Sequence, residues 1–226
     1  MKFDIQKQTT PKKNFRVDSV MGMFDIKNIT ISEKFEGELP IEKEKWNIGI
    51  IVGPSGTGKT TIIQNLFPEH VKEKENWSEN CILDDMPKEC SIKEITKTFN
   101  NVGFSSPPSW LKPFNVLSEG EKMRVRLAKE LLEKKEIIVF DEFTSVVDRQ
   151  VAKFGSYCVG KNIRKNNKKF VAVSCHYDII DWLEPDWIFD TKDFSFFLQK
   201  NKDQKLNWKF LNAKNTFGKF LGNITI

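Results

Sequence analysis

The residues best suited to chemistry form one short glycine-rich segment. Its glycines are followed by a lysine and a hydroxyl residue, at the spacing of the Walker A pattern. Glycines let successive backbone N–H groups converge on an anion without Cβ atoms in the way. Lys59 would neutralise β- and γ-phosphate oxygens, and the Thr60 hydroxyl would ligate magnesium. We predict a phosphate cradle made of Gly53, Pro54, Ser55, Gly56, Thr57, Gly58, Lys59, Thr60 and Thr61.

Two carboxylates follow a second apolar segment. Residues 137–140 read Ile-Ile-Val-Phe, and Asp141 and Glu142 come directly after them. In an α/β sheet, ligands bind at the carboxyl ends of the strands, where these carboxylates would emerge. Alone, such a pair is more often a solvated loop. Behind a Walker A pattern it predicts that Asp141 holds magnesium and that Glu142 orients or deprotonates an attacking water.

A third segment, Leu117 to Lys122, is typical of a helix start. Ser118 followed three residues later by Glu121 is a capping box, and apolar residues then recur at helical spacing. Gly120 leaves room for an anion beside the opening turn, and the Ser118 hydroxyl could bind it. As a bare capping box, the segment marks only the beginning of a helix.

The elements that must position these groups alternate between strand and helix. Residues 47–52, 137–140 and 170–174 predict buried parallel strands, whereas residues 62–67, 122–135 and 151–164 predict helices. This alternation favours an α/β fold of the P-loop NTPase type. We expect one domain of residues 1–226, with a short helical insert at about 68–116. Within the insert we expect a helix near 92–99 and a proline-rich loop at 105–113.

Composition agrees with a globular protein. The chain has 226 residues, 39% hydrophobic and 30% charged, and no apolar run approaches the ~20 residues of a membrane span. Its amino terminus does not resemble a signal peptide. The four cysteines lack the spacing of a zinc site or a disulfide framework, which favours reduced thiols. We therefore expect a soluble, cytoplasmic protein.

Taken in order, the motifs resemble those of ATP-binding-cassette (ABC) ATPases. Leu-Ser-x-Gly-Glu-Lys just ahead of the Walker B strand is similar to their signature motif, and Thr144 to Asp148 resembles their D-loop. His176, at the end of a predicted strand, resembles their switch histidine. A lone histidine there is more often structural, but its place in the ordered series favours the switch role. The resemblance covers about residues 48–187.

The resemblance implies how the chain would work. Catalysis would depend on Lys59, Glu142 and His176, and magnesium would bind at Thr60 and Asp141. The working unit would be a head-to-tail homodimer. Each ATP would lie between the Walker A loop of one copy and Ser118, Gly120 and Asp148 of the other.

The chain also departs from the family pattern. The glutamine expected ahead of the helical insert is absent, and strand-like Cys81 to Leu83 leads into Asp84-Asp85 instead. Either aspartate could replace it at the metal, although two solvated loop acids are an equal alternative. Phe15 and Phe24 are candidates for stacking on adenine, but we favour a core position for each. With this short insert, and above all in the string Asp-Glu-Phe-Thr-Ser-Val-Val-Asp-Arg (residues 141–149), the chain most resembles compact stand-alone cassettes of bacterial mobile elements and phages.

The carboxyl-terminal segment, residues 191–226, is basic and aromatic. It holds seven lysines against two aspartates, interleaved with phenylalanine and tryptophan. Lysines and aromatic faces suit nucleic acid, but a half-buried strand with a wet face explains the same alternation and is favoured. Nucleic acid and a separately encoded effector protein are therefore candidate partners, and a membrane partner is less favoured.

From these observations we expect an ATP-hydrolysing, magnesium-dependent ABC-class protein that switches a partner, such as a mobile-element DNA-processing or defence protein. Two alternatives stay open. One is the nucleotide-binding subunit of an ABC transporter, which the missing glutamine and short insert disfavour. The other is a P-loop kinase acting on a small molecule or nucleic acid, which the signature helix disfavours.

Overall fold

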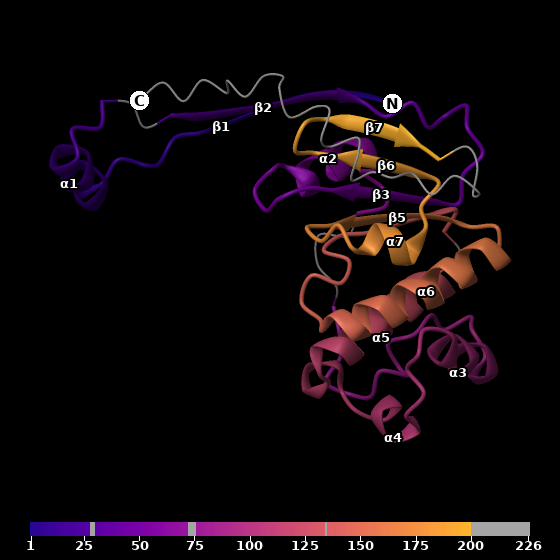
Figure 1. Cartoon of the computed structure of the whole chain (residues 1–226). Helices are drawn as coiled ribbons and strands as arrows, with labels where there is room; N and C mark the ends of the chain where they lie inside the picture. The colour runs from indigo at the N-terminus through magenta and orange to yellow at the C-terminus, as the bar shows by residue number, and fades with distance from the viewer. Residues whose placement is uncertain (28–29, 72–75, 134, 200–226) are drawn as a thin grey trace.

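The core of the protein is a five-stranded sheet. A computed structural model describes residues 1–27, 30–71, 76–133 and 135–199. The strands lie in the order β4-β5-β3-β6-β7, and neighbouring strands are parallel except β6 and β7, which are antiparallel (Figure 1). Their bounds are β3 Ile48–Val52, β4 Ile137–Phe140, β5 Lys169–Ser174, β6 Trp187–Asp190 and β7 Ser195–Leu198.

Strand β3 is central because every one of its five residues is buried. Ile48, Ile50 and Val52 pack in one hydrophobic core, whereas Ile51 packs in a second core on the other face of the sheet. This division follows from the alternation of side chains along a strand. A continuous apolar, β-branched sequence is thus what a strand covered on both faces requires.

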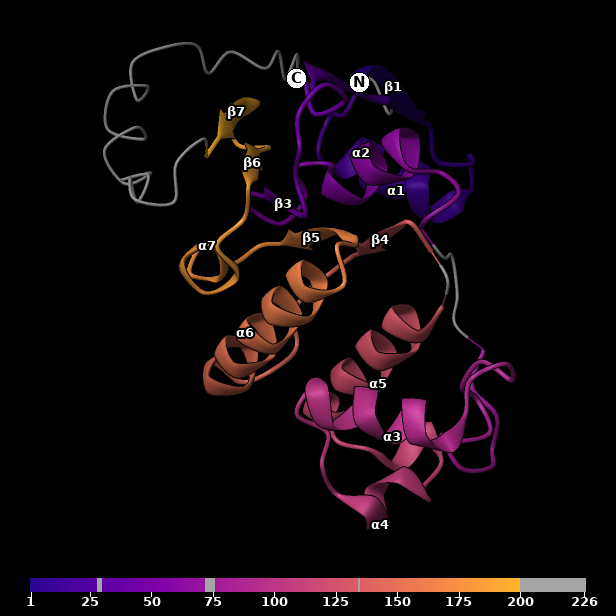
Figure 2. The same ribbon diagram turned by 90° about the vertical axis from the view of Figure 1, so that its right-hand side faces the viewer.

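Helices cover the two faces. α5 (Glu119–Leu132), α6 (Arg149–Lys165) and α7 (Ile179–Leu183) contribute to the core that contains Ile48, and α2 (Lys59–Leu66) contributes to the other. Figure 2 shows α5 and α6 on one side of the sheet and α2 on the opposite side.

A small helical group packs beyond α5. It contains α3 (Ile92–Asn101), the short α4 (Pro107–Trp110) and the 3-10 turn η1 (Phe114–Val116). α3 contacts α5, and buried Ile95 and Phe99 join the core of the main sheet. Along the chain, this group lies between α2, which follows the glycine-rich loop, and α5, which begins after Ser118.

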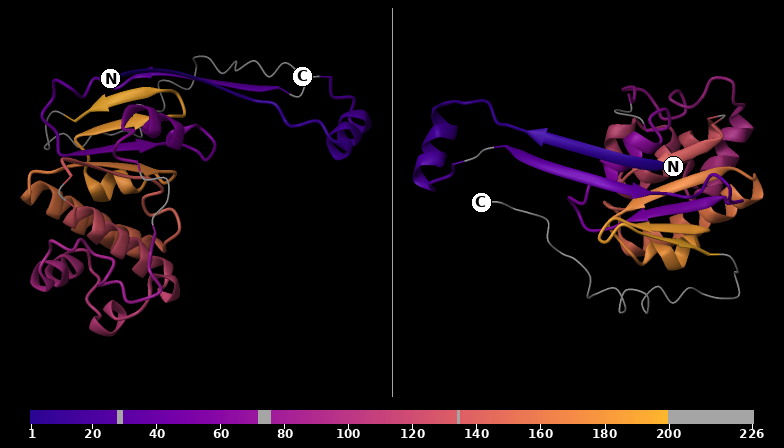
Figure 3. Two further views of the ribbon diagram at one scale, coloured as in Figure 1. Left: turned by 180° about the vertical axis from the view of Figure 1, so that it is seen from behind. Right: turned by 90° about the horizontal axis from the view of Figure 1, so that it is seen from above.

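The amino-terminal part forms an arm. β1 (Lys2–Thr9) and β2 (Ile31–Glu38) pair as an antiparallel ribbon, and between them lies helix α1 (Phe15–Met23). Figures 1 and 3 show that the ribbon starts on the body of the protein and carries α1 far from it. Only Phe3 on β1 and Phe35 on β2 are buried, so no buried side chain supports the outer half of the ribbon.

The structure confirms the α/β fold and the three predicted strands, with ends shifted by one residue at most. The predicted helices correspond to α2, α5, α6 and α3.

Two expectations are wrong. Cys81 to Leu83 form no strand but enter a turn, and a short helix, α4, occupies the proline-rich loop, because Pro107 and Pro108 suit its first turn. Of residues 191–226, the structure describes 191–199. β7 there is half-buried, and the rest lies outside the described residues.

Candidate functional site

The glycine-rich loop wraps the beginning of α2 at the carboxyl end of β3. Gly53, Gly56 and Gly58 all have positive φ angles (151°, 83° and 79°), which other residues adopt only with strain. Gly58 is the N-cap of α2, and no side chain caps this helix end. The free N–H groups and the positive end of the helix dipole therefore face the loop, as phosphate binding requires.

Lys59 points back into this loop. Its ammonium donates to the carbonyl oxygens of Gly53 (2.9 Å) and Pro54 (2.7 Å). Burial lowers the pKa of Lys59, and the neighbouring Cys175, Asp141 and Glu142 partly oppose that shift. Burial disfavours the charged ammonium. Negatively charged phosphate oxygens in place of the carbonyls would stabilise this charged form.

The two motifs meet directly. The Thr60 hydroxyl donates to a carboxylate oxygen of Asp141 at 2.7 Å. Glu142 follows in the left-handed region (φ 52°), and its N–H donates to the other Asp141 oxygen at 2.8 Å. The N–H of Phe143 donates to the carbonyl of Val173 on β5, which holds this loop against the sheet. Two hard oxygen donors thus stand side by side, the donor type that magnesium prefers.

A cavity of about 420 Å³ collects these groups. Its lining includes Lys59, Thr60, Asp141 and Glu142 with Ser55, Gly56, Gly58 and Thr61. No group of three or more histidine, cysteine or acidic side chains in the described ranges could hold a metal by itself. A magnesium ion bound at Thr60 and Asp141 would therefore depend on phosphate oxygens and water for its other ligands, as is common for this ion.

The remaining predicted residues lie outside this lining. Ser118 is the N-cap of α5, and both hydrogen bonds of the predicted capping box with Glu121 are present. These bonds, led by that from the Ser118 backbone, lower the pKa of Glu121. Asp148 is the N-cap of α6. Neither of these caps, nor Gly120, lines the cavity that contains Lys59.

His176 follows β5 next to Cys175, which does line the cavity, but His176 itself does not. The backbone N–H of His176 donates to the Ser174 hydroxyl at 3.1 Å. The two acids proposed in place of the missing glutamine are engaged in their own loop. Asp84 accepts from Asn80, and Asp85 accepts from the N–H of Ser78 at 3.1 Å. Their role at a metal stays a prediction.

The expectation that Phe15 and Phe24 are core residues is wrong. Both lie at the end of the arm and are 85% and 72% exposed, and among the described residues α1 contributes none to a core. The aromatic residue beside the phosphate loop is instead Phe35 of β2, which lines the cavity. Sequence reasoning missed it because β2 is polar on both sides of Phe35, and nothing in its pattern indicates a contact with Gly58.

Sequence reasoning also missed Thr191, which contacts the glycine-rich loop. The N–H of Thr191 donates to the carbonyl of Val52 (2.8 Å), and its hydroxyl contacts that of Thr57 (2.5 Å). Beside it, Tyr177 donates to both oxygens of Asp190 at 2.9 and 3.0 Å. Burial, followed by the charge of Asp190, raises the pKa of Tyr177, which therefore stays protonated.

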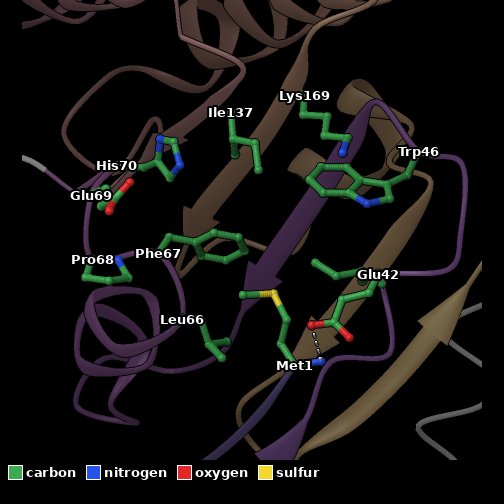
Figure 4. Close-up of a pocket in the computed structure, with 11 residues that line it drawn as sticks. Met1, Glu42, Trp46, Leu66, Phe67, Pro68, Glu69, His70, Ile137 and Lys169 are labelled. Atoms are coloured by element: carbon green, nitrogen blue, oxygen red, sulfur yellow. Dashed lines mark ion pairs between the residues drawn. The ribbon is translucent and has the colours of Figure 1, made fainter.

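A second cavity of about 310 Å³ lies at the amino ends of the strands, away from the glycine-rich loop at the carboxyl end of β3. Trp46, Ile137 and Lys169 line it where β3, β4 and β5 begin, and Figure 4 shows Lys169 above the Trp46 ring. His70, the other histidine of the chain, also lines this cavity. His70 is therefore remote from the phosphate loop.

Comparison with known proteins agrees with this geometry. A model of the family described as the Rad17 P-loop domain matches residues 25–183. The chain belongs to this P-loop family. The ribosome protection protein VmlR of Bacillus subtilis is 26% identical over 118 residues, which cover 43% of this chain and 21% of VmlR. A second relative from the same organism, described as "Probable peptide export ATP-binding protein YydI", is 25% identical over 151 residues, covering 59% and 72% of the two chains.

The fold is also that of solved ABC cassettes. The dimeric structure of MJ0796, a bacterial ABC transporter cassette, matches with a TM-score of 0.54 and 16% identity over 74% of this chain and 89% of that one. This member of the P-loop family thus has the fold of an ABC-type cassette core. The chain spans only about a fifth of VmlR. No helix in the described ranges is long and apolar enough to cross a membrane.

The contact between Gly58 and Phe35 gives a first prediction. A Cβ at Gly58 would lie 2.4 Å from the Phe35 ring, whereas a Cβ at Gly56 meets nothing within 4 Å. Both positions have positive φ, so each alanine substitution should cost about 1–2 kcal/mol of backbone strain. Gly58→Ala should cost about 1–3 kcal/mol more, because it overpacks Phe35. Urea unfolding of both variants measures the difference, and equal losses of stability would contradict the contact.

Proposed function

We propose that the protein is a magnesium-dependent ATPase whose working form is an ATP-bridged homodimer. One observation carries this proposal. Lys59, Thr60, Asp141 and Glu142 line one cavity, whereas Ser118 and Gly120 begin a separate helix outside it. A second copy in head-to-tail orientation would bring its own Ser118 to the cavity. One triphosphate would then contact two helix amino ends, one from each copy.

The chemical roles follow from the positions of the groups. The loop N–H groups and Lys59 would bind the β- and γ-phosphates, and Thr60 and Asp141 would hold magnesium. Magnesium, when bound, neutralises charge on the phosphoryl group in transfer. The Glu142 carboxylate would orient or deprotonate the attacking water. We propose His176 and Asp148 as further contacts that form in the dimer.

A direct test measures phosphate release from ATP with and without magnesium. The wild-type chain should release phosphate only with magnesium, and Asp141→Asn should lower the rate at least about 100-fold at saturating magnesium. Asp181→Asn, an exposed acid on α7, is the matched control and should keep the wild-type rate. Unchanged turnover in Asp141→Asn would overturn the proposed metal site.

For the biological role, we propose that the dimer switches a separately encoded effector or a nucleic acid, as a compact stand-alone cassette of the mobile-element or phage type. The small helical group beyond α5 supports this subtype. DNA mobility shifts at increasing salt test the nucleic-acid version. Binding without salt dependence, or no binding, would contradict it.

A transporter subunit is the second candidate, because the chain covers 72% of YydI, whose printed description is a peptide export ATP-binding protein. Co-purification of a membrane protein with the chain from native membranes would favour this candidate over the first. A kinase has no such support, and phosphate release without an acceptor would exclude it.

A further inference from the structure

The end of the arm, residues 10–27, exposes many large apolar side chains. We name this segment the arm tip. α1 has no buried residue among its nine. Of the apolar side chains in the arm tip, Phe15, Val20, Met23, Phe24 and Ile26 are all exposed, and Ile31 lies exposed at the adjoining end of β2.

Such a tip is not expected to be stable without a partner. Isolated helices shorter than about 12–15 residues are marginal in water, since most helical stability comes from packing. Soluble proteins rarely expose adjoining large apolar side chains, and when they do, these mark binding sites. The arm tip therefore has the features of a surface that is covered in the working protein.

The base of the arm is fixed to the phosphate loop. Lys7 of β1 donates to the Thr61 hydroxyl at 2.7 Å, and Phe35 of β2 packs against Gly58. Beyond these contacts the ribbon continues outward through Gln8 and Thr9, paired with Ser32 and Ile31. Figures 1 and 3 show that it leaves the body past the start of α2. The arm tip thus projects from the edge at which the nucleotide cavity lies.

A complementary surface lies next to Ser118. The loop of residues 76–91 and the segment of residues 111–117 form it, because the N–H of Ile82 donates to the carbonyl of Lys112 and the Trp77 ring stacks on Phe114. We name this surface the insert face. Leu111 and Val116 on it are 68% and 61% exposed.

The two surfaces also have opposite charges. The arm tip carries Lys12, Lys13, Arg16 and Lys27 against two aspartates. The insert face carries Glu79, Asp84, Asp85 and Glu89 against Lys88 and Lys112, apart from any charge outside the described ranges. Opposite charge sets the orientation of two surfaces that meet, and apolar anchors supply most of the affinity.

We infer that the arm tip of one copy docks on the insert face of a second copy. This inference rests on the proposed ATP-bridged dimer, in which the cavity of one copy faces Ser118 of the other. The arm leaves that cavity edge outward, and the insert face adjoins Ser118. The dimer would then contain two such contacts, and in each of them α1 of one copy would be buried against the insert face of the other copy.

The test uses the full chain carrying Glu142→Gln, with ATP and magnesium. In the combined variant Phe15→Ser, Met23→Ser and Phe24→Ser, the dimer dissociation constant, measured by sedimentation, should rise at least about ten-fold. These side chains are exposed, so the fold should be unaffected, and circular dichroism checks this. Arg16→Glu by itself should weaken the dimer, and Glu79→Lys with Glu89→Lys, at two exposed acids of the insert face, should restore it.

A photo-crosslinker locates the contact. Phe15→p-benzoylphenylalanine should give an ATP-dependent crosslinked dimer, with the attached peptide from residues 76–91 or 111–117. If the Glu142→Gln chain dimerises with unchanged affinity after the three serine substitutions, or position 15 crosslinks elsewhere, this inference alone is overturned. If these substitutions instead abolish DNA binding and leave the dimer intact, a nucleic acid is the occupant and the inference is wrong. If Glu142→Gln never dimerises, the proposed function fails first and the inference with it.

Discussion

Replacing Lys59 by alanine should abolish detectable ATP turnover. Lys59 is the cation that lines the phosphate cavity beside Thr60, and its ammonium now contacts only two loop carbonyls within the described part of the chain. Loss of one preorganised charge at a transferring phosphoryl group costs about 10²–10³-fold in rate, and loss of ground-state binding adds to this. Phosphate release and titration with a fluorescent ATP analogue measure the two effects separately.

Lys153→Ala is the matched control for Lys59→Ala. Lys153 is an exposed lysine on α6, so its removal changes the net charge equally without touching the cavity. It should keep wild-type turnover. Loss of activity in both variants would indicate a general charge effect, and turnover retained by Lys59→Ala would remove the phosphate loop from the mechanism.

Replacing Glu142 by glutamine should separate binding from hydrolysis. The amide keeps the size of the side chain and its place in the loop that Phe143 anchors to β5. It cannot accept the proton of the attacking water, so turnover should fall about 10²–10⁴-fold. ATP binding should remain, since Lys59 and the loop N–H groups are unchanged. A Glu142→Gln chain with wild-type turnover would contradict the assigned role.

Two inactive chains should complement each other if the site is shared. Lys59→Ala damages the cradle, and Gly120→Asp places a carboxylate where Ser118 should approach phosphate. A Cβ at Gly120 lies no closer than 3.4 Å to Val151, so this variant should fold. In a one-to-one mixture, half the dimers would hold one intact site, giving about a quarter of wild-type activity. No activity in the mixture would argue against composite sites.

The predicted parts of the fold have strong local signals. β3, β4 and β5 are apolar runs that need cover on both faces, and α5 begins at a capping box that the structure contains. The meeting of Thr60 with Asp141 follows from two motifs at the carboxyl ends of strands in one sheet. These elements could be predicted because short-range pattern and tertiary position agree.

The arm and its contacts could not be predicted in the same way. Beyond Ile5, β1 is polar on both faces and the outer half of β2 is mostly polar, so no alternation distinguishes these parts from a loop. Phe15 and Phe24 are large and hydrophobic, which favours a core position, but α1 has no buried residue in the part of the chain that the structure describes. Phe35 reaches the phosphate loop through long-range packing, which a single sequence does not display.

The central claim is that ATP joins two copies of this chain, and multi-angle light scattering of the Glu142→Gln protein tests it most directly. One chain has a mass of 26.3 kDa. With ATP and magnesium the scattering mass should double, and it should return to that of one chain with ADP. A Glu142→Gln protein that binds ATP but keeps the mass of a single chain at saturating nucleotide would contradict the account.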